Sequence, residues 1–136
     1  EKQKNVKKIC DQNKIDFLAY SPLAFGILCR DPQKNDIGKR SLFRNFIFQT
    51  YDKPTLELRK VMKEIAKARS ASLAQVALNW CFYQGAIPIV GLRKKDQVLD
   101  ISKSLRWDLT NREFKRLENA SKNCSKKIPD NPFSSL

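Results

Sequence analysis

Three cations cluster where an anion would be favoured. Arg93, Lys94 and Lys95 follow Gly91 and open a stretch with helical spacing of apolar residues. Cations are unfavourable at a bare helix N-terminus, because the helix dipole and the unpaired amide hydrogens there attract negative charge. A phosphate shared by these side chains and the backbone amides would remove the conflict. The spacing predicts a phosphate site, the alternative being surface lysines in a lysine-rich chain.

A second candidate position is the end of a short apolar run, from Ile15 to Tyr20. Such runs are typical of strands that are buried on both faces of a parallel sheet. The Ser21-Pro22 pair ends the run and stiffens the turn, and Gly26 permits a close backbone approach. The aromatic ring of Tyr20 at this point could support a planar ligand.

The elements that must position these residues alternate between helix and strand. Helical spacing is found over residues 3–12, and a capping box of Ser72 with Gln75 begins another helix that Gly85 ends. A second capping box, Thr110 with Glu113, begins the last helix. The remaining expected elements are a helix opened by Pro54, with its stripe at Leu58, Val61, Met62 and Ile65, a strand over Ala86–Val90, and a helix through Val98, Ile101 and Leu105.

Between the first strand and the Pro54 helix, residues 29–53 are polar, basic and aperiodic. This pattern predicts a long loop, with an aromatic cluster at Phe43, Phe46, Phe48 and Tyr51. Residues 123–136 contain two prolines and predict an extended tail.

This order of elements is typical of α/β folds with parallel strands, where ligands lie at the carboxyl ends of the strands. We therefore expect five residues to share one face: Tyr20, Ser21, Gly91, Leu92 and Arg93.

Composition limits the remaining possibilities. The 136 residues are enough for one modest domain, and no apolar run approaches the roughly 20 residues that span a bilayer. The first residue is Glu1, so we expect either a removed leader or part of a longer chain.

The four cysteines have no metal-ligand spacing and histidine is absent, which favours free buried thiols in a reducing compartment and no metal site. The net charge of +13 is compatible with a polyanion partner, but scattered lysines favour solvated helix faces over nucleic-acid binding.

Three blocks in this order, "FLAYSPLAFGIL", "LAQVALNW" and "AIPIVGLRKKDQV", resemble the C-terminal portion of the aldo-keto reductases, (β/α)₈ TIM barrels that reduce carbonyls with NADPH. The resemblance covers residues 3–122 and implies an α/β fold that is the last part of such a barrel, with residues 1–122 as the barrel segment. A complete barrel takes roughly 250 residues.

The resemblance implies a cofactor site at both strand ends. Tyr20 matches the aromatic residue that stacks on the nicotinamide, while Ser21 and Leu23 match the turn that wraps the pyrophosphate. Positions matching the loop and helix that hold the 2′-phosphate and adenine are occupied by Gly91, Leu92, Arg93 and Gln97. Leu92 stands where the family usually has a hydroxyl residue, and Ile101 where it commonly has an adenine-contacting Asn.

The family's catalytic Asp, Tyr, Lys and His lie on earlier strands, so we expect catalysis to need an N-terminal part and this chain to be inactive alone. The alternative is a non-catalytic reductase fragment that serves as a structural subunit. In either case we expect the rest of the barrel, a partner protein or a multi-subunit complex to cover the open strand edges. The block "ALNWCFYQGAIPIVGLR" is most similar to plastid and cyanobacterial members, which favours a plastid over the cytoplasm.

Overall fold

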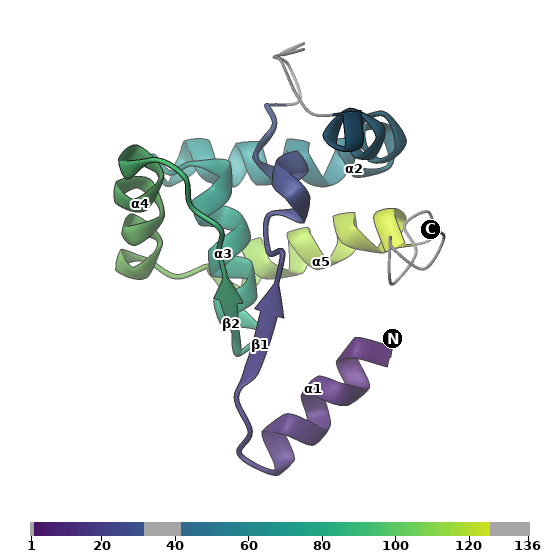
Figure 1. Ribbon diagram of the computed structural model, residues 1–136. Coiled ribbons are helices and arrows are strands. Elements are labelled where there is room, and N and C mark those ends of the chain that lie inside the picture. Colours follow the sequence, from purple (N-terminus) through teal and green to yellow (C-terminus); the bar gives the residue numbers. More distant parts are fainter. Residues whose placement is uncertain (1, 32–41, 126–136) are drawn as a thin grey trace.

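The computed structural model describes residues 2–31 and 42–125 (Figure 1). In chain order the elements are α1 (Lys2–Gln12), β1 (Phe17–Tyr20), the 3₁₀ segment η1 (Ala24–Cys29), α2 (Leu42–Ala68), α3 (Leu73–Tyr83), β2 (Ala86–Ile89), α4 (Lys95–Ser102), the 3₁₀ segment η2 (Lys103–Arg106) and α5 (Asn111–Ser125). The expected helix at the N-terminus and the two expected strands are confirmed, each within a few residues.

The two strands form a parallel pair. Phe17 lies opposite Ala86, and Tyr20 lies opposite Ile89, so both strands end at the same edge. The connection from β1 to β2 runs through η1, α2 and α3, as parallel pairing requires. The expected α/β class with parallel strands is therefore confirmed.

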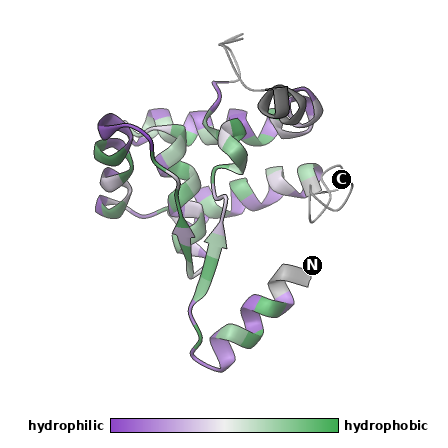
Figure 2. Cartoon of the chain, in the orientation of Figure 1, coloured by the Kyte–Doolittle hydropathy of each residue, from purple (hydrophilic) through white to green (hydrophobic). Residues whose placement is uncertain are grey.

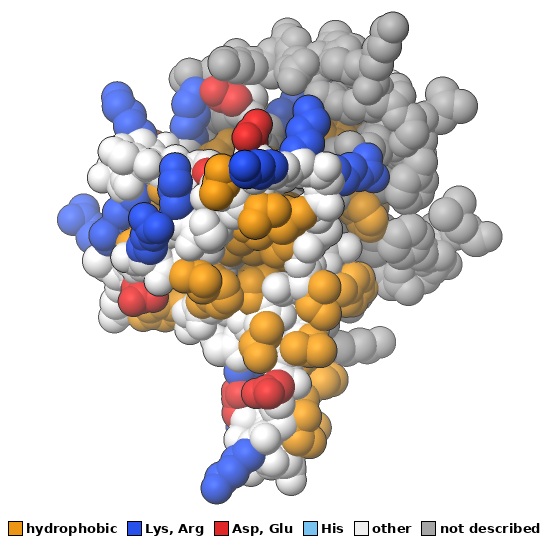
Figure 3. All heavy atoms as spheres, turned by 60° about the vertical axis from the view of Figure 1, so that its left-hand side comes forward, with side chains coloured by type: hydrophobic (Ala, Val, Ile, Leu, Met, Phe, Trp, Pro, Cys, Tyr) orange, Lys and Arg blue, Asp and Glu red, His pale blue; other side chains and the backbone are white. Residues whose placement is uncertain are grey.

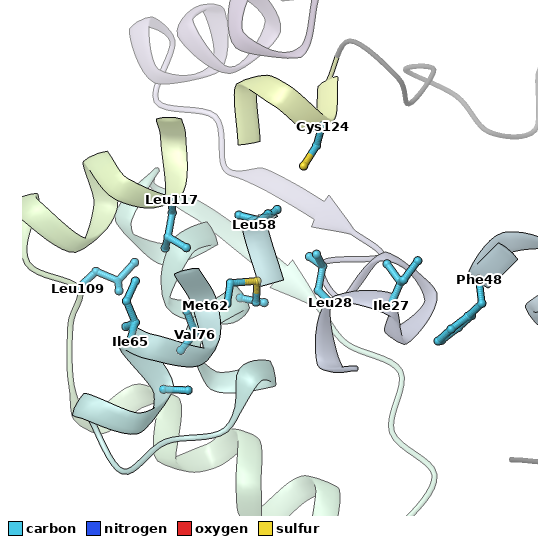
Figure 4. Packing of buried hydrophobic residues seen from close by; sticks show 12 residues of the cluster. Ile27, Leu28, Phe48, Leu58, Met62, Ile65, Val76, Leu109, Leu117 and Cys124 are labelled. Atoms are coloured by element: carbon cyan, nitrogen blue, oxygen red, sulfur yellow. The ribbon is translucent and has the colours of Figure 1, made fainter. Parts of the chain in front are cut away.

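A helical layer supplies the core. The apolar stripe of α2 at Leu58, Met62 and Ile65 packs against α3 and α5, and contributes side chains that are at most 4% exposed. Val76 of α3 and Leu117 of α5 complete this cluster, which Figure 4 shows from close by. Burial of this apolar surface is the main stabilising contribution to the fold.

Local signals explain where the helices begin. Thr110 and Glu113 form the complete capping box, because each accepts from the other's backbone amide, at 3.2 and 2.8 Å. The Ser72 hydroxyl likewise accepts from the Gln75 amide at 3.2 Å, but the Gln75 side chain donates to Asp100 instead of returning to Ser72. The predicted capping box of Ser72 with Gln75 is therefore only half formed.

The prediction of a loop up to residue 53 was wrong, because α2 already begins at Leu42. Pro54 lies inside this helix, not at its first position, and Figure 1 shows the helix changing direction between its dark-blue and teal parts. Phe48, Tyr51, Thr55 and Leu58 continue one inward stripe through the proline. The rest of the expected loop, residues 32–41, and the side chains of Phe43 and Phe46 lie outside the described residues.

The strands are not buried on both faces as expected. Leu18 and Tyr20 of β1 are 56% and 66% exposed, and their partners Ile87 and Ile89 of β2 are 48% and 53% exposed. We call these four side chains the open sheet face. Both strands are coloured apolar in Figure 2, and Figure 3 shows hydrophobic side chains gathered on the molecular surface beside a group of lysines and arginines. Helices cover only the other face, which explains the exposure.

At the C-terminus, α5 continues to Ser125, so the predicted extended tail was wrong for residues 123–125. The remainder of that tail lies outside the described residues. Within the described ranges, no helix combines the length and the apolar character needed to cross a bilayer.

Candidate functional site

A groove of about 700 Å³ opens where both strands end. It is lined by the segment after β1 and by the segment between β2 and α4, and six of the expected cofactor residues contribute to it: Ser21, Leu23, Gly91, Leu92, Arg93 and Gln97. Parallel pairing brings these residues together from positions about 70 apart in the sequence. Their expected proximity is confirmed, while their contact with a cofactor stays a prediction.

Tyr20 is the expected site residue that does not line the groove. Its side chain belongs to the open sheet face, at the end of β1 and beside Ile89. The ring is 66% exposed and therefore presents a flat aromatic surface next to the groove. The expected stacking role of Tyr20 stays a prediction.

The turn after β1 has an unusual backbone. Ser21, Ala24 and Phe25 have positive φ angles of 49°, 46° and 56°, and Gly26 has a φ of 93°. Positive φ angles cost free energy for residues other than glycine. Packing around the turn must therefore stabilise this backbone conformation. Gly26 is the position where the sequence supplies the residue that the backbone favours.

The start of α4 is already capped within the chain. The side-chain oxygen of Gln97 accepts from the backbone amides of Arg93 and Lys94, at 2.9 and 3.1 Å. Asp96 also places a carboxylate in the first turn. The Gln97 oxygen thus pairs with amide hydrogens at the helix start, and the Asp96 carboxylate lies near the positive end of the helix dipole. The unfavourable interaction between the three cations and this helix start is therefore smaller than the sequence indicated.

A polar junction joins α3 to α4 below the groove. The Asp100 carboxylate accepts from the Ser72 hydroxyl at 2.6 Å and from the side-chain amide of Gln75 at 2.7 Å. Gln75 is 4% exposed and also accepts from the Trp107 indole at 3.3 Å. A second cavity of about 320 Å³ lies here, with Ser72, Asp100 and Ile101 in its lining.

Sequence reasoning missed Asp100. Its two partners lie 25 and 28 residues away, and local patterns carry no sign of a contact at that separation. Only the position of Asp100, one turn after Gln97 on the same short helix, indicated that its side chain could reach the site.

Two of the four cysteines are poor nucleophiles. All four are free thiols, as expected, but only Cys124 is buried, while the other three are partly exposed. Burial, reinforced by the Asp100 carboxylate, raises the pKa of Cys29 at the groove to about 11, and burial alone raises the pKa of Cys81 to about 11. Both thiols are therefore protonated and unreactive at neutral pH.

The groove is suited to an elongated anionic ligand. Arg93 contributes a cation to the lining, Lys94 and Lys95 follow it in the chain, and the turn after β1 on the other side has positive φ angles. A methyl group built on Gly91 would have no neighbouring atom within 4 Å, so the fold itself does not require glycine there. The bare backbone at Gly91 instead leaves the wall of the groove open to a ligand.

Comparisons with known proteins agree with this architecture. The model of the Aldo/keto reductase family matches residues 1–122. A chloroplastic pyridoxal reductase from Arabidopsis thaliana is 39% identical over 98% of this chain, and a 7-acetyl-epi-neemfruitin B aldo-keto reductase from Melia azedarach is 29% identical over 85%. The chain spans 36% and 30% of the lengths of these two relatives.

A solved structure shows the same fold. A glycerol dehydrogenase from Gluconobacter oxydans superposes with a TM-score of 0.74 at 23% identity, over 95% of this chain and 40% of that protein. The two strands and their helices thus correspond to part of a (β/α)₈ barrel. Taken with the family match over residues 1–122, this shows that the chain belongs to the aldo/keto reductase family.

Proposed function

We propose that the chain is the cofactor-binding, C-terminal part of an NADPH-dependent aldo-keto reductase. The observation that carries the proposal is the groove at the shared carboxyl edge of β1 and β2, which brings six sequence-predicted residues together beside a cluster of cations. Family membership supports an oxidoreductase that uses a nicotinamide cofactor.

The residues present fit such a cofactor. The guanidinium of Arg93 can pair with a phosphate through two parallel hydrogen bonds, and Lys94 and Lys95 add positive charge nearby. Leu23 and Leu92 offer apolar surface, and Tyr20 offers a ring face at the strand end. The Gln97 amide group, whose oxygen already caps α4, leaves two N–H donors to direct at the ligand.

When bound, NADPH supplies a hydride for carbonyl reduction. This chain would bind and orient the dinucleotide, and its buried thiols would take no part. We assign the proton donor to another part of the protein, because the sequence holds no histidine and none of its three tyrosines, all of them described, is in the groove lining. We assign the acid–base tetrad to barrel strands other than β1 and β2.

Two features concern the surroundings of the protein. The open sheet face would be covered by the remaining barrel strands, which would remove its exposed apolar surface from water. The chloroplastic relative supports a plastid location.

Calorimetric titration of the purified chain with NADPH tests the proposal. We expect saturable binding, and we expect Arg93→Met to raise the Kd about tenfold, because a charge-assisted phosphate contact contributes about 1.5 kcal/mol or more. Arg112→Met is the matched control: it removes the same charge from the first turn of α5, outside the groove lining, and should leave the Kd unchanged.

The competing function is a non-catalytic structural subunit, which the exposed apolar side chains of the open sheet face also favour. That function predicts no heat of NADPH binding and no NADPH-dependent rise in melting temperature. Equal weakening by Arg93→Met and Arg112→Met would instead show that NADPH binds only through the overall positive charge. Either result would contradict a cofactor site in the groove.

A further inference from the structure

One wall of the groove is formed by the segment after β1, whose backbone conformation has to be stabilised. We call Ser21–Asp31 the strap: its first part lines the groove, and its side chains at Ile27 and Leu28 are buried in the core. Ser21, Ala24 and Phe25 keep positive φ angles, which are unfavourable for residues other than glycine. Contacts outside the strap therefore have to fix its conformation.

The far end of the strap is held by ion pairs to α2. The Arg30 guanidinium donates to the Asp52 carboxylate at 2.8 Å and lies 5.8 Å from the centre of the Phe48 ring. One residue further on, Asp31 accepts from Lys63 at 2.7 Å. Charges of both signs on α2 thus pair with successive residues of the strap.

Arg59 lies at the centre of these contacts. It is 1% exposed, and its guanidinium donates to the Asp52 carboxylate at 2.8 Å, to the Asp52 carbonyl at 2.8 Å and to the Thr55 hydroxyl at 3.2 Å. It also reaches the backbone carbonyl of Arg30 at 3.4 Å, which links α2 directly to the strap. Burying a guanidinium costs free energy unless the group is paired. We therefore expect the fold to depend on these hydrogen bonds of Arg59.

Pro54 lies in the same stretch of α2 as these contacts. Proline has no amide hydrogen, so it interrupts the regular helical hydrogen bonds around it. The Thr55 hydroxyl donates to the carbonyl of Tyr51 at 2.7 Å, and Arg59 takes the carbonyl of Asp52. The Asp52 carbonyl and the Thr55 hydroxyl, both acceptors for Arg59, thus lie within two residues of Pro54.

We propose that Arg59 and Asp52 are positioning residues that lock the strap against α2 and so fix one wall of the groove. Neither residue lines the groove, so their effect on any ligand passes through the strap. The assignment of NADPH as that ligand rests on the proposed function, whereas the lock itself does not.

Hydrogen exchange of the whole chain tests the lock. Four backbone bonds report on the strap: Ala24 N to Ser21 O at 2.8 Å, Gly26 N to Leu23 O at 2.8 Å, Leu28 N to Leu23 O at 3.4 Å, and Arg30 N to Ile27 O at 3.1 Å. We expect Arg59→Met to accelerate exchange of these amides at least about tenfold, with a smaller change in α3 and α5, because local opening needs less free energy than global unfolding.

Controls separate a lock from general stabilisation. Arg69→Met removes an arginine directly after the end of α2, which pairs with Glu113 of α5 and does not reach the strap. It should not accelerate exchange of the strap amides more than exchange of the core amides. Asp52→Asn is the milder variant if Arg59→Met does not fold, since Asp52 is 36% exposed. Arg59→Lys keeps the charge but loses the fork of donors, and should restore protection only in part.

The outcomes are distinct. Equal acceleration in the strap and in α5, or no acceleration in the strap, would overturn the proposal. Selective acceleration together with a raised Kd for NADPH would support both the lock and the cofactor. If the strap opens selectively but the unmodified chain binds no NADPH, the lock stands and the proposed function fails.

Discussion

At the scale of single residues, Gln97 serves two purposes that respond differently to charge. Its side-chain oxygen caps α4 through the amides of Arg93 and Lys94, and it also lines the groove. A carboxylate at this position would make a better cap and a better partner for the helix dipole. The same carboxylate would repel a phosphate in the groove.

We therefore expect Gln97→Glu to stabilise the chain by about 0.5 kcal/mol and to weaken NADPH binding several-fold. Thermal unfolding and a binding titration of the same variant check the two effects. Gln84→Glu adds the same charge at the end of α3, outside the groove lining, and should not alter NADPH binding. Unchanged or tighter binding by Gln97→Glu would contradict the assignment of Gln97 to the cofactor.

Residues that belong to local motifs could be predicted from the sequence, and residues that meet only through the fold could not. Gly91, Arg93 and Gln97 lie in one short block, so their proximity follows from chain connectivity. The contact between Ser72 and Asp100 depends on how α4 packs against α3. Nothing in the neighbourhood of either residue indicates that packing.

At the scale of elements, Glu113 joins α5 to the end of α2. The hydrogen bond from Arg69 lowers the pKa of the Glu113 carboxyl to about 2 from its ordinary value of 4.5, against the opposing effect of burial and with further help from Thr110. A lowered pKa means that the folded state favours the ionised form. Its stabilisation is complete above pH 4.5 and is lost as the pH falls towards 2.

We expect Glu113→Gln to lower the free energy of unfolding by about 1 kcal/mol at pH 7, because it removes the ion pair with Arg69 and replaces the charged acceptor of the helix cap by a neutral one. Urea unfolding at several pH values should show this difference shrinking below pH 4.5. Glu57→Gln, whose carboxylate is 66% exposed and pairs with Lys60 three residues on, should cost at most about 0.5 kcal/mol. A difference that stays constant down to pH 2 would contradict the linkage.

The start of α2 shows why some elements resist prediction. Pro54 satisfies the preference for the first position of a helix, and the basic residues before it mask the apolar stripe. The stripe becomes visible only when Phe48, Tyr51 and Leu58 are seen to share one buried side. The side chains of Thr55 and Arg59 donate to the carbonyls of Tyr51 and Asp52 in this part of the helix.

At the scale of the whole molecule, a bare sheet face and a strongly basic surface have to be explained together. The open sheet face fits coverage by further barrel strands, since the chain spans 40% of its structural neighbour. The net charge of +13 would attract any polyanion without specificity. A test of the cofactor site must therefore separate a located ligand from general attraction to lysines.

The most direct measurement is an amide chemical-shift map of the chain during titration with NADPH. A cofactor site predicts saturable changes confined to Tyr20, the strap and residues 91–97, and no comparable response to inorganic pyrophosphate at the same concentration. Small changes spread over lysines in α1, α2 and α5, reproduced by pyrophosphate and abolished by salt, would contradict a cofactor-binding groove.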